Sequence, residues 1–168
     1  MRQNGILTAS FLVLTAVTIF LRLYAFEENV MFIGDQGRDA LIIHQIVTLE
    51  KFTLIGAPSS IGMVFLGPFY YYLVAPFLLL FGFNPAGLAF GVAFFAILGT
   101  LVATGIIVQK YHWIPALTFL GLIGFSSTLI DFSRFSWNPN LLPYLSFFTL
   151  FWFVKWLEKP SFKYGVLF

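Results

Sequence analysis

The chain has 168 residues, of which 60% are hydrophobic and only 10% are charged. Soluble domains carry about 25% charged residues, so this composition excludes an ordinary globular domain and predicts an integral membrane protein. The net charge of +2 is small and dispersed, which argues against nucleic-acid binding, and the absence of cysteine excludes disulfides, thiolate nucleophiles and cysteine-ligated zinc.

The first predicted element is a membrane span at residues 5–25, which follows the basic residue Arg2. This pattern is compatible with a signal peptide or with a membrane anchor. The sequence RLYAFEEN that ends the segment offers no small-x-small cleavage site. We therefore expect an uncleaved signal anchor.

A loop follows at residues 26–85 and is too long to be a simple connector. Apolar residues at spacings of one, three and four predict an amphipathic helix at 35–50. At about 100° per residue, Asp35 and Asp39 fall on the apolar face of this helix, with Arg38 at its margin. Burying uncompensated carboxylates is costly, which favours a functional site. The alternative is that Asp35 caps the helix while Arg38 and Asp39 form a solvated first turn.

Residues 67–82 are apolar but contain two prolines and are too short for a spanning helix, which needs about 20 residues. We expect a helix that lies in, or dips into, the outer leaflet. Tyr70, Tyr71 and Tyr72 fit an interfacial aromatic belt, and the alternative is that one hydroxyl faces an external cavity and holds a polar ligand. Neither of the two histidines stands in a cluster with ligand spacing, so no metal site is expected.

Three further spans are predicted at residues 86–108, 114–131 and 141–157. The distribution of lysine and arginine chooses between four spans and five, because cytoplasmic loops are enriched in these residues. If 67–82 does not cross, five basic residues are cytoplasmic and four are external; if it crosses, the numbers are two and seven. The four-span arrangement is favoured, with the N-terminus in the cytoplasm and the loop 26–85 outside. We expect the plasma membrane of a prokaryote rather than the endoplasmic reticulum.

A second external stretch precedes the last span. Asn138 followed by Pro139 is typical of a helix start, and Trp137 is an ordinary interface anchor. Asp131 and Arg134, three residues apart, could pair with each other. The final residues, EKPSFKYGVLF, resemble the beginning of another apolar segment. We therefore expect the N-terminal part of a longer protein.

Three segments in this order resemble the N-terminal portion of GT-C membrane glycosyltransferases: GDQGRDALIIHQI, LIGAPSSIGMVFLGPFYYYLVAPFLLLFGFNP and DFSRFSWNPNLLP. The resemblance is closest to family 39, the group of dolichyl-phosphate-mannose protein mannosyltransferases and bacterial lipid A aminoarabinose transferases. It implies an all-α polytopic fold, here an incomplete GT-C helical bundle with interfacial helices in its first external loop. The implied activity is transfer of a sugar, usually with inversion, from a polyprenyl-phosphate donor to a hydroxyl of a protein, lipid or glycan. The expected partners are this donor, the acceptor and membrane lipid, without nucleic acid or cofactor.

The resemblance also implies roles for individual residues. Asp35 matches the family's first-loop general base, and Arg38 matches the arginine that holds the donor phosphate. Gln36 departs from the mannosyltransferases, which often carry a second acid there, and so gives no support for a metal. The further candidates for binding substrate are Asp39, Tyr70, Arg134, Trp137 and Asn138.

Two other functions remain as alternatives. A transporter or flippase subunit for a lipid-linked substrate would need ionisable residues at mid-membrane depth, and the predicted spans contain almost none. A non-catalytic membrane scaffold, or a truncated and inactive paralogue, is the other.

Overall fold

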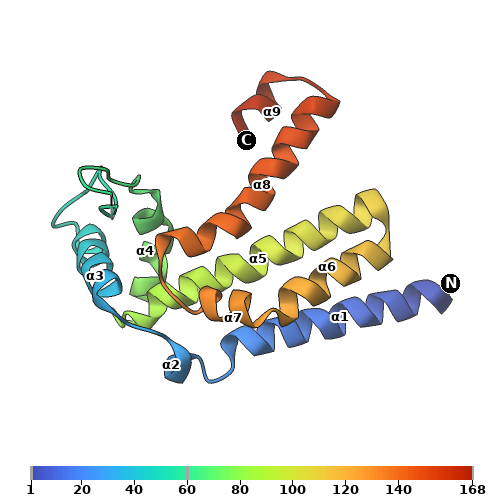
Figure 1. The fold of residues 1–168 in the computed structure, drawn as a ribbon, viewed down its shortest axis with the longest axis horizontal. Coiled ribbons are helices and arrows are strands. Elements are labelled where there is room, and N and C mark those ends of the chain that lie inside the picture. Colours follow the sequence, from blue (N-terminus) through green and yellow to red (C-terminus); the bar gives the residue numbers. More distant parts are fainter. Residues whose placement is uncertain (1, 60, 168) are drawn as a thin grey trace.

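A computed structural model describes residues 2–59 and 61–167, and within these ranges the chain is helical, with a single isolated antiparallel bridge and no named strand (Figure 1). This confirms the predicted all-α class. The helices are, in chain order, α1 (Arg2–Leu23), α2 (Phe26–Asn29), α3 (Gly34–Val47), α4 (Phe69–Leu80), α5 (Ala86–Tyr111), α6 (Trp113–Phe125), α7 (Ser127–Ser133), α8 (Asn138–Glu158) and α9 (Phe162–Leu167).

Two helices of the described chain are long and apolar enough to cross a membrane: α5 and the Gly5–Leu23 part of α1. A third crossing is formed if α6 and α7 are one span, although they are bent by 65° where they meet. The helix α4 has 12 residues and a length of about 18 Å, well short of the ~30 Å hydrocarbon core. The helix α8 includes the predicted segment 141–157 but is not among the helices that are long and apolar enough to cross a membrane.

The helix α5 lies at the centre and packs against α1, α4, α6 and α8. Most residues of its buried face are glycine, alanine or threonine, which allow neighbouring backbones to approach closely. At Gly99 an added Cβ would lie 2.9 Å from the Cβ of Tyr144 on α8. At Gly124 of α6 it would meet Thr18 of α1. Small residues therefore set the spacing of this bundle.

The bend between α6 and α7 leaves the last carbonyl groups of α6 without helical partners, and a buried arginine from α1 donates hydrogen bonds to them. The Arg22 side chain donates to the carbonyl oxygens of Ile123 at 3.0 Å and Gly124 at 3.3 Å. Ser126 begins the new helix, since its hydroxyl accepts from the Leu129 N–H. The predicted continuous span 114–131 is therefore two helices.

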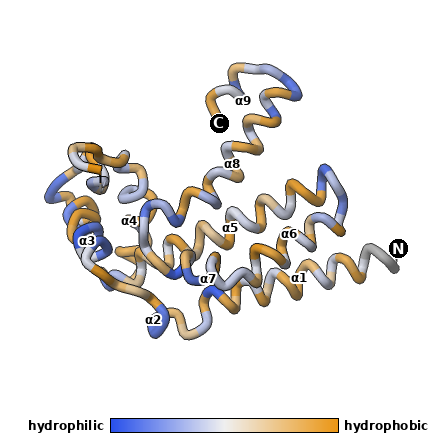
Figure 2. Tube along the Cα trace, in the orientation of Figure 1, coloured by the Kyte–Doolittle hydropathy of each residue, from blue (hydrophilic) through white to orange (hydrophobic). Residues whose placement is uncertain are grey.

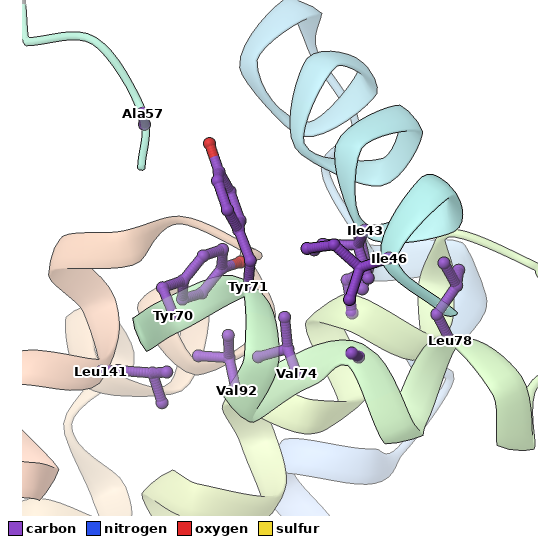
Figure 3. Close-up of a cluster of buried hydrophobic side chains, with 11 residues drawn as sticks. Ile43, Ile46, Ala57, Tyr70, Tyr71, Val74, Leu78, Val92 and Leu141 are labelled. Atoms are coloured by element: carbon purple, nitrogen blue, oxygen red, sulfur yellow. The ribbon is translucent and has the colours of Figure 1, made fainter. Parts of the chain in front are cut away.

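The two ends of the bundle differ in content. Figure 1 shows α2, α3, α4 and α7 at one end, and the N-terminus and the α5–α6 turn at the other. At the first end, Ile43 of α3 and Val74 of α4 pack in one core cluster with Val92 of α5 and Leu141 of α8 (Figure 3). This cluster holds the polar residues of α3 in a fixed position against the bundle.

Candidate functional site

The first turn of α3 is fixed by Gln36 rather than by an aspartate cap. The helix begins after Ile33, whose N–H donates to the Gln36 side-chain oxygen at 2.9 Å. The Gln36 amide donates in turn to the Ser136 carbonyl oxygen at 3.4 Å, and Gln36 is fully buried. Asp35 lies within the first turn instead of capping it, where its negative charge is favoured by the helix dipole. Gln36 therefore attaches α3 to the segment before α8 and leaves the Asp35 carboxylate free for other contacts.

The polar residues of α3 form a cluster centred on Arg38. Its Nη1 lies 3.0 Å from Oδ1 of Asp35, and its Nη2 and Nε lie 2.8 Å and 2.9 Å from Oδ1 of Asp39. The hydroxyl of Tyr71, on α4, donates to the same Asp39 oxygen at 3.1 Å. Residues Asp35, Arg38, Asp39 and Tyr71 are here called the Arg38 cluster. It joins the N-terminal part of α3 to α4.

The two carboxylates of the cluster stand in different environments. The side chain of Asp35 is 52% exposed, whereas that of Asp39 is 2% exposed. The Arg38 side chain is 32% exposed and bridges the exposed Asp35 and the buried Asp39. Burial excludes the hypothesis that Asp39 belongs to a solvated first turn. Asp35 is therefore the carboxylate of the cluster that is open to solvent.

Burial and charge shift the pKa values of the cluster in a consistent way. Burial raises the pKa of Asp39, and the hydrogen bond and positive charge of Arg38 oppose that rise. Burial alone would lower the pKa of Arg38, but its hydrogen bond and ion pair with Asp39 raise it overall. Burial and the neighbouring Asp39 raise the pKa of Tyr71 to about 12, so its hydroxyl remains a donor. Arg38 therefore stays charged while two partners hold it.

Two of the other sequence-predicted residues lie together in a pocket of about 320 Å³ between α4 and the start of α8. Tyr70 and Asn138 line it, mostly among leucine side chains, whereas Arg38 and Asp35 do not. The Tyr70 hydroxyl is buried and has no hydrogen-bond partner among the described residues. Burial and the nearby charge of Asp39 raise the pKa of Tyr70. The pocket is mainly apolar.

Trp137 and Arg134 lie outside the Arg38 cluster. Trp137 is 43% exposed and its ring packs against Phe135 at a centroid distance of 6.2 Å, as expected of an interface anchor. The Arg134 guanidinium donates to three carbonyl oxygens at the end of α1, those of Leu21, Arg22 and Tyr24. These contacts give Arg134 the role of a C-terminal cap on α1. No ion pair joins it to Asp131 within the described residues.

Two polar contributors are not predicted by the sequence. Tyr71 fits an aromatic belt or a hydroxyl that holds a ligand, but in the structure it is the hydrogen-bond partner of Asp39 across 32 positions of sequence. Asn140 is buried, and its amide donates to the carbonyl oxygens of Phe132 and Phe135, which orders the stretch before α8. The sequence offers one indication of each role: Tyr71 lies in a run of three tyrosines, and Asn140 lies in the polar stretch that begins at Asn138.

Across residues 2–59 and 61–167, no group of three or more histidine, aspartate or glutamate side chains is arranged to hold a metal ion. The chain matches no protein-family model, no curated protein and no solved structure.

Proposed function

We propose that the chain is a glycosyltransferase that moves a sugar from a polyprenyl-phosphate donor to an acceptor hydroxyl on the outer face of the membrane. The observation that carries the proposal is the sharing of one arginine between an exposed carboxylate and a buried one. Such a site combines a base and a phosphate-binding cation within one helical turn. The order of motifs described above supports the same chemistry by resemblance.

Asp35 is the general base in this proposal. Its carboxylate accepts the proton of the acceptor hydroxyl as that oxygen attacks the anomeric carbon of the sugar. A new C–O bond forms on one face while the bond from the anomeric carbon to the phosphate oxygen breaks on the other. The electron pair leaves with the polyprenyl phosphate. The exposure of Asp35 supports this role because the acceptor must reach it.

Arg38 is the group that matches the charge of the leaving phosphate. Each terminal guanidinium nitrogen carries two N–H groups, and one on each is engaged with Asp35 or Asp39. The second N–H groups can donate to phosphate oxygens in the paired geometry that arginine favours. Asp39 and Tyr71 act as positioning residues, because both are buried and fix the arginine rather than touch the substrate.

The proposed membrane arrangement has four spans, with the Arg38 cluster outside in the plasma membrane of a prokaryote. The balance of lysine and arginine supports it. The arrangement is also compatible with the grouping of α2, α3, α4 and α7 at one end of the bundle, away from the N-terminus (Figure 1).

The test is transfer of a radiolabelled sugar from a polyprenyl-phosphate donor by membranes that contain the full chain. Replacing Asp35 with Asn should lower transfer by about 10²-fold or more while leaving the protein inserted and folded, because the amide cannot accept the proton. Glu28→Gln is the matched control, since Glu28 is an exposed acid on α2 without an ion pair to Arg38. Undiminished transfer by the Asp35 variant would overturn the general-base assignment.

A further inference from the structure

The segment between α3 and α4 folds into a short hairpin made by residues 56–59 and 61–66. An isolated antiparallel bridge pairs Pro58 with Phe65. The backbone hydrogen bonds run from the Gly56 N–H to the Leu66 oxygen, from the Leu66 N–H to the Ala57 oxygen, and from the Ser59 N–H to the Val64 oxygen. Many of the hairpin's backbone polar groups are therefore satisfied internally.

The base of the hairpin is attached firmly to the bundle. An added Cβ at Gly56 would lie 2.7 Å from the Gly67 carbonyl carbon, so only glycine permits this close approach. Ala57 is buried and belongs to the same core cluster as Tyr71 (Figure 3). The Tyr72 hydroxyl donates to the Thr53 oxygen at 2.8 Å, which fixes the chain as it enters the hairpin. The base of the hairpin is thus fixed relative to the helices.

The hairpin and its approach expose large apolar side chains. Met63 is 97% exposed, Leu54 86% and Ile61 74%. The other exposed apolar residues of this surface are Phe52, Ile55, Val64, Phe65 and Leu66. Contiguous exposed apolar patches mark binding surfaces for protein or lipid. These residues are here called the hairpin surface.

We propose that the hairpin surface inserts into the lipid at the membrane interface beside the helical bundle. The sequence from 52 to 109 contains no aspartate, glutamate, lysine or arginine, so no charge opposes entry into lipid. Lys51 stands just before this stretch, where an ammonium can reach lipid phosphates while its stem lies along apolar surface. Paired backbone groups lower the cost of entering an apolar medium.

The position of the hairpin favours lipid over another protein as its partner. It lies at the end of the molecule where α5 begins, and α5 is one of the two helices able to cross a membrane (Figure 1). Apolar residues recur along the loop among more polar ones (Figure 2), and the loop leads into the apolar helix α4. In this proposal, lipid covers a surface that runs from the spans to the hairpin. This inference holds whether or not the chain transfers sugar.

The test uses a single cysteine, which is simple to place because the chain has none. The Met63→Cys variant is labelled with the environment-sensitive fluorophore NBD and reconstituted into vesicles of phosphatidylcholine and phosphatidylglycerol. Lipids with a nitroxide near the headgroup, or deep in the acyl chain, are then added as quenchers. Leu54→Cys is a second reporter on the same surface, and Glu28→Cys is the water-exposed control.

We expect the shallow nitroxide to quench the labels at positions 63 and 54 several-fold more than the label at position 28, and more than the deep nitroxide does. Equal, weak quenching at all three positions would overturn the proposal. A blue-shifted label at position 63 without lipid quenching would also overturn it, because protein rather than lipid would then cover the surface. Unchanged elution of each labelled variant in size-exclusion chromatography verifies that the bundle is intact.

Discussion

Removing the charge of Arg38 should destabilise the protein mainly through the buried carboxylate of Asp39. In the Arg38→Met variant, Asp39 keeps only the Tyr71 hydroxyl on its Oδ1 atom, and its side chain is 2% exposed. Breaking a buried ion pair by removing one partner costs about 3–5 kcal/mol. Because Arg38 is one third exposed, we expect a cost below this range, about 2–3 kcal/mol.

Double-mutant cycles separate the two ion pairs of Arg38. Combined with Asp39→Asn, the arginine substitution should cost less than about 1 kcal/mol, since no buried charge is left unpaired. Combined with Asp35→Asn, it should cost nearly as much as alone, because exposed pairs are worth about 0–1 kcal/mol. The free energy of unfolding is measured by circular dichroism in mixed dodecylmaltoside and SDS micelles. Equal coupling to the two acids, or stronger coupling to Asp35, would refute the argument from burial.

Three further predictions concern the bundle and its orientation. Arg22→Met should lower the free energy of unfolding by about 2–3 kcal/mol, because it leaves the Ile123 and Gly124 carbonyl groups unpaired. A loss below about 0.5 kcal/mol, which is typical of a surface substitution, would contradict this role. Gly99→Ala should cost about 1–3 kcal/mol in the same unfolding assay, because the new methyl group meets Tyr144. The control Gly105→Ala, which has open space around it, should be neutral or stabilising. Equal effects of the two substitutions would contradict the close α5–α8 packing. A cysteine at Glu28 should react with a membrane-impermeant thiol reagent added outside intact cells, and a cysteine at the exposed Tyr111 should not; the reverse pattern would overturn the four-span arrangement.

Helices set by local pattern could be predicted closely from the sequence. The spacing of apolar residues predicted a helix at 35–50, and α3 is Gly34–Val47. The predicted start of the span 86–108 agrees with α5, which follows Pro85. The helix start predicted at Asn138 and Pro139 is confirmed, since α8 begins at Asn138 with Pro139 in its first turn, but Trp137 rather than Asn138 is the N-cap residue.

Features that depend on pairing across the chain could not be predicted in this way. The bond between Tyr71 and Asp39 needs the packing of α4 on α3, which no local pattern encodes. Arg134 was expected to bind substrate, and the structure places it on the last carbonyl groups of α1. The bend at Ser126 leaves carbonyl groups that Arg22 satisfies, and this contact joins residues about 100 positions apart. Burial of Asp39 was suggested by its helical face, whereas Asp35 on that same predicted face is exposed because α3 has only begun there.

The separate roles proposed for Asp35 and Arg38 are tested most directly by steady-state kinetics of sugar transfer, measured over a range of donor concentrations. The Asp35→Asn variant should lower kcat by about 10²-fold or more while the KM for the polyprenyl-phosphate sugar stays near that of the wild type, because the lost group acts on the acceptor proton. Arg38→Lys should instead raise the donor KM, because lysine cannot give the paired hydrogen bonds of a guanidinium. A wild-type kcat in the Asp35 variant, or a donor KM unchanged by the Arg38 substitution, would contradict the account.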